Sequence, residues 1–184
     1  MKNKALFIIL FISITTCGQV IDFKNDKYWI ESGIGIAQTT SSSKDADIAA
    51  EFAFNLIKGK SILKTRILAV SEFNILAGGN ESSINIGALI GKHHSTKFFK
   101  ASYLAGLGIT TGQERGKKIG TTGGWLSFNR YEMNNFTSIS IPIEVNLVLK
   151  PMKFIGIGLT LFGDINAKRS SYGLLLKLEV GKLR

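Results

Sequence analysis

The chain has few of the residues that cross-link, bend or catalyse. Its 184 residues include one cysteine, two prolines and two histidines. A single cysteine cannot form an internal disulfide, and a composition that is 45% hydrophobic with so little proline argues against a disordered chain. Acidic residues are also scarce, because 13 Asp and Glu face 23 Lys and Arg, which gives a formal net charge of +10. A partner attracted over distance is therefore expected to be anionic, which leaves nucleic acid, lipid and polysaccharide.

The N-terminal residues indicate export. Two lysines precede an apolar run over 5–14, and small and polar residues follow up to Gly18. This layout predicts a secretory signal peptide over 1–18 and a lead-in over 19–27, because the apolar run is too short to span a membrane as a helix. Two readings of the processing site stay open, cleavage after Gly18 or lipidation of Cys17 as in a bacterial lipoprotein. An exported basic protein meets lipid headgroups and polysaccharide, so no nucleic-acid partner is expected.

Beyond the lead-in, apolar side chains recur with period two, and helical spacing is nowhere sustained. The clearest case has one parity that is entirely apolar, namely Ile139, Ile141, Ile143, Val145, Leu147 and Leu149. The opposite parity reads Ser138, Ser140, Pro142, Glu144, Asn146 and Val148. Similar alternation predicts further strands over 28–37, 48–56, 63–75, 83–90, 99–109, 155–164 and 172–181. About eight strands result, most of roughly 10 residues, the length that a tilted strand needs to cross a bilayer.

The second face of these strands does not have the composition that water favours. It is rich in Gly, Ala and Ser, and its few charges have both signs. Small residues and paired charges are typical of the filled interior of a narrow barrel, where a buried charge needs a partner. The candidate interior ion pairs place Glu31, Glu51, Glu72, Glu144, Asp164 and Glu179 opposite Lys64, Arg66, Lys100 and Lys177.

The connections between the predicted strands alternate in length. The turns around Gly59, over 93–96 and around Pro151 are short and would lie at the same end as the N-terminus. The opposite end receives the connections over 41–45, 77–82, 111–136 and 167–170, and only one of these is long. Such asymmetry is typical of membrane barrels, which have short periplasmic turns and longer extracellular loops.

These patterns resemble the small bacterial outer-membrane β-barrel proteins of the OmpA/OmpX type. The resemblance covers 28–184, and the run over 171–184 looks like the closing strand that barrel assembly machinery recognises. It implies an all-β, eight-stranded antiparallel up-and-down transmembrane barrel in the outer membrane of a Gram-negative bacterium. The role it implies is structural or one of surface interaction, with outer-membrane lipid and lipopolysaccharide as further partners. Candidate interface aromatics are Tyr28, Tyr103 and Tyr172.

Pro142 interrupts this picture at one point. A closed barrel has no free edge at which a missing backbone N–H is harmless. A β-bulge is therefore expected at this residue.

The long connection over 111–136 carries cations interleaved with aromatic side chains. Such a surface can bind sugars, anionic lipid or protein. The candidate binding residues are Arg115, Lys117, Lys118, Trp125, Arg130 and Tyr131. The alternative is that this stretch extends its neighbouring strands above the membrane and packs on itself.

No motif for catalysis, metal binding or cofactor binding emerges. His93 and His94 are adjacent, so a strand would point them to opposite faces, and the sequence has no third histidine. A narrow barrel is filled by its own side chains, so neither an enzyme nor a general pore is expected. Two alternatives stay open, a soluble secreted lipocalin-like barrel that binds an apolar ligand with both faces reversed, and a lipid-modifying barrel enzyme.

Overall fold

The computed structural model describes residues 27–40, 46–72, 80–122 and 128–183, and for 121–122 and 128–130 only the backbone. The expected signal peptide, Cys17 and Trp125 lie outside the described residues. No helix in the described ranges is long and apolar enough to cross a membrane.

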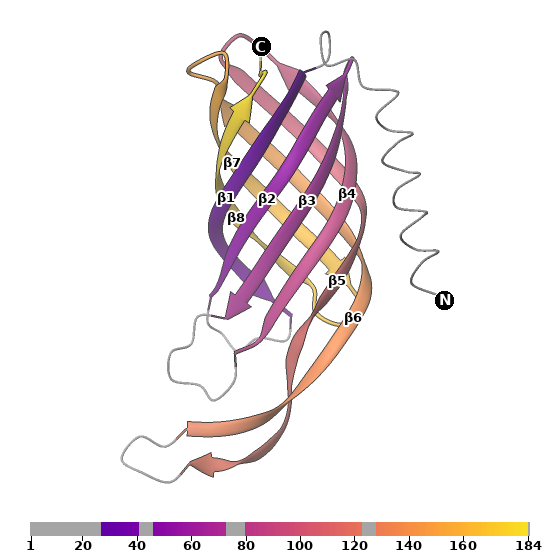
Figure 1. Ribbon diagram of the computed structural model, residues 1–184, viewed down its shortest axis with the longest axis vertical. Helices are drawn as coiled ribbons and strands as arrows, with labels where there is room; N and C mark the ends of the chain where they lie inside the picture. The colour runs from indigo at the N-terminus through magenta and orange to yellow at the C-terminus, as the bar shows by residue number, and fades with distance from the viewer. Residues whose placement is uncertain (1–26, 41–45, 73–79, 123–127, 184) are drawn as a thin grey trace, which may run out of the picture.

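Eight strands form one closed antiparallel barrel within this described part (Figure 1). They are β1 Lys27–Thr39, β2 Asp47–Lys58, β3 Ser61–Glu72, β4 Ser82–Ser95, β5 Phe99–Thr122, β6 Phe128–Leu149, β7 Ile155–Asn166 and β8 Ser171–Gly181. Each strand pairs with the next along the chain, and β1 closes the barrel on β8 from Trp29 opposite Gly181 to Thr39 opposite Ser171. The predicted up-and-down topology is therefore confirmed.

The two faces of the strands point as the alternation predicts. The outward apolar residues of β6, from Ile139 to Leu149, are 42% to 76% exposed, while Glu144, Asn146 and Val148 between them are buried. The same alternation of exposed and buried residues runs through β2, β3 and β7. The barrel thus has an apolar outer wall and a largely polar lumen.

The lumen is layered, and the inward residues of β3 follow the layers in order. Ile62 belongs to an apolar cluster near the start of β1 and the C-terminal residues, which also contains Trp29 and Leu183. Lys64 and Arg66 come next, and Leu68 with Val70 then joins a second apolar cluster. Glu72, the last inward residue of β3, lies at the far mouth. Charged groups in the middle of the lumen are therefore enclosed by apolar layers on both sides.

The short turns lie together at the end of the barrel that holds the C-terminus, at the top of Figure 1. Gly59, with a φ of 64°, closes the β2–β3 turn in a conformation that glycine adopts without strain. The prediction of a turn over 93–96 was wrong at its start. His93, His94 and Ser95 belong to β4 and pair with β5, so the turn occupies 96–98.

Pro142 lies in β6 without the expected bulge. The pairs Ala105–Ile143 and Gly108–Ser140 have the same register, so no extra residue is inserted between them. The β5–β6 ladder is instead interrupted at the two intervening positions, while Pro142 stays opposite Asp164 of β7. An inserted residue would move the apolar side chains of β6 to the opposite face of the sheet. The missing N–H of Pro142 is therefore accommodated by an interruption of the ladder, with the register unchanged.

β5 and β6 are the longest strands, with 24 and 22 residues. The β4 ladder leaves β5 at Gln113, and the β7 ladder leaves β6 at Ser140. Beyond these points the two strands pair with each other, and this β5–β6 extension, 114–122 with 128–139, projects below the barrel in Figure 1. The prediction of a loop over 111–136 was therefore wrong for most of its length, and the alternative of extended strands describes it.

Candidate functional site

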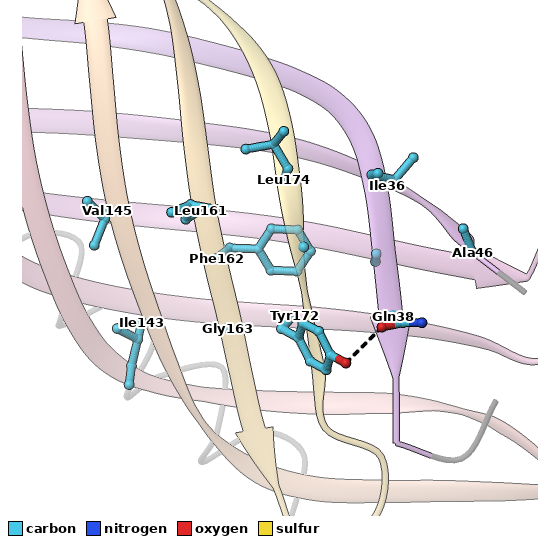
Figure 2. Close-up of a pocket in the computed structure, with 12 residues that line it drawn as sticks. Ile36, Gln38, Ala46, Ile143, Val145, Leu161, Phe162, Gly163, Tyr172 and Leu174 are labelled. Atoms are coloured by element: carbon cyan, nitrogen blue, oxygen red, sulfur yellow. Dashed lines mark hydrogen bonds between the residues drawn. The ribbon is translucent and has the colours of Figure 1, made fainter. Parts of the chain in front are cut away.

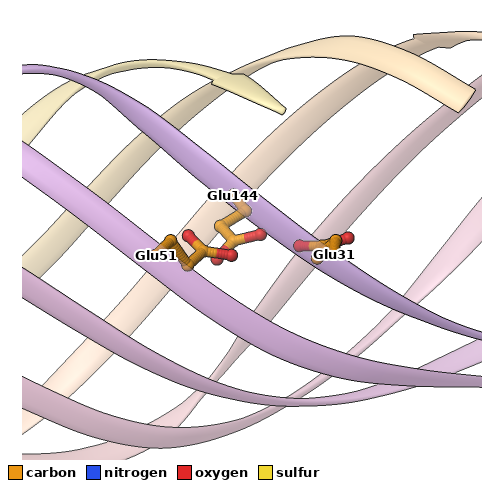
Figure 3. Close-up of side chains that lie close together, drawn as sticks. All are labelled: Glu31, Glu51 and Glu144. Atoms are coloured by element: carbon orange, nitrogen blue, oxygen red, sulfur yellow. The ribbon is translucent and has the colours of Figure 1, made fainter. Parts of the chain in front are cut away.

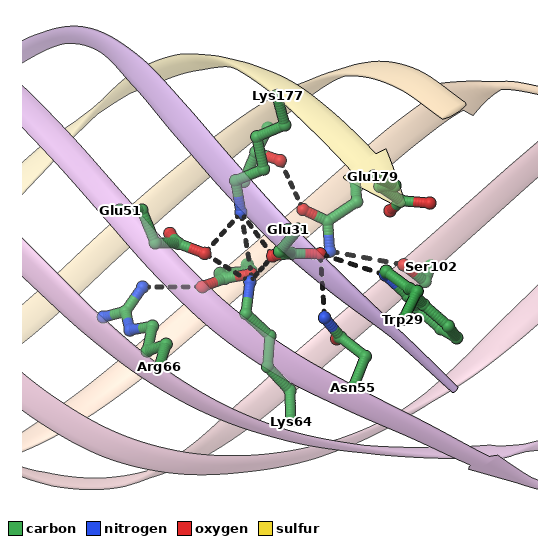
Figure 4. A network of polar contacts seen from close by, with 12 residues as sticks. Trp29, Glu31, Glu51, Asn55, Lys64, Arg66, Ser102, Lys177 and Glu179 are labelled. Carbon is green, nitrogen blue, oxygen red and sulfur yellow. Dashed lines mark hydrogen bonds and ion pairs between the residues drawn. The ribbon is translucent and has the colours of Figure 1, made fainter. Parts of the chain in front are cut away.

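The middle layer of the lumen is a network of ion pairs centred on Lys64 of β3 (Figure 4). Lys64 is 0% exposed, and its Nζ lies 2.6 Å from Glu51 Oε1, 2.5 Å from Glu144 Oε2 and within contact of Glu31 Oε1. Glu31, Glu51 and Glu144 come from β1, β2 and β6, so one ammonium joins four strands across the lumen.

A second ammonium shares the same carboxylates. Lys177 Nζ of β8 lies 3.0 Å from Glu31 Oε1 and 2.7 Å from Glu51 Oε1. Arg66 donates from Nη1 to Glu144 Oε1 at 2.7 Å. Three cations thus meet three carboxylates, and Asn55 adds a hydrogen bond from Nδ2 to Glu31 Oε2 at 3.0 Å.

Lys100 and Glu179 form a separate pair nearer the chain ends. Lys100 Nζ donates to both carboxylate oxygens of Glu179, at 2.7 and 2.6 Å. The same ammonium lies 3.7 Å from the centroid of a Trp29 ring, a cation–π contact. Trp29 Nε1 donates to Glu31 Oε2 at 3.4 Å, which connects this pair to the central network.

The three central carboxylates could by themselves be taken for a metal site. Single oxygens of Glu31, Glu51 and Glu144 lie within 4.8 Å of one another (Figure 3). The ammonium groups of Lys64 and Lys177 contact all three side chains, and so they already supply the positive charge that a metal ion would bring. The arrangement serves as a buried, charge-balanced support that cross-links the barrel.

A second charged cluster closes the far mouth, and the sequence predicted only part of it. Arg169 Nη2 lies 3.5 Å from Asp47 Oδ2 and 3.4 Å from Glu81 Oε2. Glu72 pairs with Arg115, whose backbone N–H also donates to Glu81 Oε1 at 2.9 Å. We call these five residues the mouth cluster.

Several of these contacts differ from the predicted interior pairs. Glu72 has Arg115 as its partner, a residue assigned from sequence to surface binding. Asp164 accepts a hydrogen bond from Thr110 Oγ1 at 3.0 Å and forms no ion pair with the described residues. Asp47 shares the inward parity of Glu51, so alternation could have identified it. Arg169 and Glu81 lie in connections, where parity carries no information.

The candidate binding residues of the β5–β6 extension divide into different environments. Arg115 points back to the mouth cluster, with its guanidinium 5.5 Å from the centroid of the Tyr131 ring. Lys117 and Lys118 are exposed beside Ile119, which is 69% exposed. Arg130 pairs through its backbone with Gly120, and Trp125 lies outside the described residues. The extension thus presents two adjacent lysines away from the barrel.

The outer wall carries exposed aromatic side chains and a shallow apolar groove. Tyr103 and Tyr172 are exposed as predicted for interface aromatics, whereas Tyr28 is half-buried. Figure 2 shows the groove of about 640 Å³ over Gly163, where Tyr172 Oη donates to Gln38 Oε1 at 2.8 Å. This exposed apolar wall, with charges inside, is the opposite of what a soluble barrel carrying an apolar ligand requires.

Comparisons with known proteins give structural matches. No family model and no curated protein matches the chain. The attachment invasion locus protein Ail of Yersinia pestis matches at a TM-score of 0.59 with 9% identity, over 84% of this chain and 97% of that one. Neisserial surface protein A matches at 0.64 with 11% identity, over 83% and 96% of the two chains.

The N-terminal β-barrel domain of Pseudomonas aeruginosa OprF matches at a TM-score of 0.53 with 8% identity, over 84% of this chain and 96% of that domain. The fold is that of the small outer-membrane β-barrels. At these identities the likeness concerns the fold alone. A further Ail structure, at 0.59 with 7% identity over 85% and 98% of the two chains, is a complex with the heparin analogue sucrose octasulfate.

Proposed function

We propose that the protein is an integral outer-membrane barrel of a Gram-negative bacterium that engages an anionic partner at the cell surface through the β5–β6 extension. The observation that carries the membrane location is the outer wall. Large Ile, Leu, Val and Phe side chains are exposed on all eight strands. Soluble monomers rarely expose contiguous apolar patches beyond a few hundred Å². Such a wall is suited to contact with the hydrocarbon chains of membrane lipids.

The orientation follows from the two ends of the barrel. The short turns lie at the end of the barrel that holds the C-terminus, and the long extension lies at the opposite end. Outer-membrane barrels keep short turns in the periplasm and long elements outside. The extension therefore projects from the cell, where its base meets lipopolysaccharide, and β8, which closes the barrel on β1, is the strand that barrel assembly machinery would recognise.

We further propose that the barrel is neither a general pore nor an enzyme. The lumen is filled by ion-paired and apolar layers, which supports a closed interior. His93 faces the lumen, half-buried, while His94 is exposed on the outer wall, so the two side chains point to opposite faces of β4. The lysines that contact Glu31, Glu51 and Glu144 leave these carboxylates engaged as ion-pair partners.

The partner class follows from charge at the exposed tip. Lys117 and Lys118 are exposed on the extension, while the carboxylates of the mouth cluster behind them contact Arg115 and Arg169. A sulfated or phosphorylated polysaccharide matches adjacent lysines. The structure of Ail with sucrose octasulfate, which has the same fold, is a precedent for a polyanion on this type of barrel.

Heparin binding by the full chain folded in detergent tests this proposal. The variant K117Q/K118Q should bind heparin about fivefold more weakly at low salt, which corresponds to ~1 kcal/mol. The control K58Q/K153Q removes the same charge from two exposed lysines at the other end and should retain most of the heparin binding. Equal losses in both variants, or no heparin binding by the wild type, would leave a structural role only.

A further inference from the structure

The end of the barrel that holds the short turns is strongly cationic. Eight lysines lie in the described turns, strand ends and C-terminal residues at this end, namely Lys27, Lys58, Lys60, Lys92, Lys97, Lys150, Lys153 and Lys182. The turns 59–60, 96–98 and 150–154 contain no acidic residue. The excess positive charge of the described residues is thus concentrated at the end opposite to the extension.

Several of these lysines line one pocket at the mouth of the barrel. It has a volume of about 630 Å³, and its lining contains the lysines Lys27, Lys60, Lys97 and Lys150 together with the imidazoles of His93 and His94. The remaining lining residues are Ser95 and Thr96, so the lining contains no acid. The charge of this pocket therefore suits an anion.

The pocket is shaped by specific contacts. Lys150 is buried, and its Nζ donates to Ser95 Oγ at 2.5 Å and to the carbonyl oxygen of Thr96 at 2.8 Å. These bonds hold the ammonium beside the β4–β5 turn. Nδ1 of His93 is buried, with no hydrogen-bond partner among the described residues.

An apolar groove on the outer wall adjoins the pocket. It has a volume of about 340 Å³ and is lined by outward residues that include Phe99, Ala101, Leu147 and Leu159. His94 and Thr96 line both the groove and the pocket. The cationic pocket and the apolar groove are therefore adjacent at the β4–β5 turn.

We propose that the pocket and groove together bind one anionic glycerophospholipid of the inner leaflet of the outer membrane. The phosphate and polar headgroup lie in the pocket, and an acyl chain lies along the groove. The inference rests on the proposed membrane location and adds a defined lipid site to it. A small soluble anion would use only the pocket, whereas a phospholipid also covers the adjoining apolar surface. Lysines at a membrane surface each favour anionic lipid, and their apolar stems pack on the chain region.

Native mass spectrometry of the full chain in detergent tests the headgroup site. Dioleoyl phosphatidylglycerol is the probe, and dioleoyl phosphatidylcholine is the zwitterionic comparison. The wild type should retain phosphatidylglycerol at lower lipid concentration than phosphatidylcholine, and K60Q/K97Q should lose about tenfold in phosphatidylglycerol affinity. K117Q/K118Q has the same charge change at the other end and should retain the preference, as should K60R/K97R.

The groove is tested with a second substitution. Ala101 is the smallest outward side chain in its lining, and A101F would fill it while leaving the pocket unchanged. A101F should lower the affinity for dioleoyl phosphatidylglycerol about fivefold. The affinity for dihexanoyl phosphatidylglycerol, whose chains are too short to follow the groove, should stay nearly the same.

Three outcomes would overturn the lipid site. They are equal retention of the two lipids by the wild type, equal losses in K60Q/K97Q and K117Q/K118Q, and an unchanged affinity of A101F for the long-chain lipid. If the protein changes gel mobility on heating, as a membrane barrel does, and still gives any of these results, the proposed function stands and only the lipid site is excluded. A chain that does not enter membranes would end both proposals.

Discussion

Lys64 is the residue on which the lumen depends most. It is fully buried and contacts three carboxylates from three other strands. The variant K64M keeps most of the side-chain volume but leaves those carboxylates with Lys177 and Arg66 alone. Breaking a buried ion pair by removing one partner typically costs about 3–5 kcal/mol. Urea unfolding of the barrel in lipid vesicles should show a loss of this size.

The matched control for K64M is K118M on the extension, where the lysine is exposed. Surface substitutions away from specific contacts usually change the free energy of unfolding by less than about 0.5 kcal/mol. If K64M unfolded at the same urea concentration as K118M, the network would not support the barrel.

Gly33 leaves room for the other central lysine. A Cβ at Gly33 would lie 2.8 Å from Lys177 Cγ and 3.3 Å from the carbonyl oxygen of Leu176, whereas a Cβ at Gly163 would meet nothing within 4 Å. G33V should therefore displace Lys177 from Glu51 and lower stability by ~1–3 kcal/mol. The same unfolding measurement on G163V should show little change, and equal behaviour of the two variants would contradict the assigned faces.

The sequence predicted which side chains point into the lumen, because parity along a strand assigns each residue to a face. It did not predict which of them meet. Lys64 and Glu144 lie on β3 and β6, 80 positions apart in the chain, and contact across the lumen. Only the closed barrel, with its register between neighbouring strands, brings these two residues together. Arg169 and its partner Glu81 were missed because both lie in connections, where parity assigns no face.

At the scale of the elements, each strand has one face toward lipid and one toward the lumen. Ile143 lies on the outward face of β6 within the barrel, and Ile119 lies outward on the extension beyond it. I143D should prevent or strongly reduce folding into vesicles, because a charge facing hydrocarbon is costly. I119D introduces the same charge where water surrounds the strand and should fold with the yield of the wild type.

Heat-dependent gel mobility after folding into vesicles measures this yield. Equal yields of I143D and I119D would show that β6 does not face lipid, and the assignment of the outer wall would be wrong.

Strand positions could be predicted from sequence where apolar and small residues alternate. The predicted 139–149 pattern lies within β6, and 99–109 lies within β5. The extension of both strands was predicted only as the alternative to a binding loop, because beyond the barrel both faces meet water and the alternation disappears. The predicted bulge at Pro142 was wrong because the alternation continues through this part of β6. The apolar residues on both sides of Pro142 keep one register with β5, and the backbone pairing is interrupted only beside the proline.

At the scale of the whole molecule, the layered lumen predicts very low conductance. The ion-paired middle layer lies between clusters that include Trp29 and Leu183 at one end and Phe162 at the other. Wild-type protein in a planar lipid bilayer should therefore give no steady channel current. Long-lived openings in the wild type would show a continuous path through the lumen and contradict the closed interior.

The central claim is that the apolar wall of this barrel lies in the outer membrane, and cell fractionation followed by gel electrophoresis tests it most directly. Samples of each fraction are run with and without boiling, because folded membrane barrels resist detergent until they are heated. The account predicts that the protein is found in the outer-membrane fraction and changes mobility on boiling. A folded monomer that stays soluble in the periplasm or the medium without detergent would contradict it.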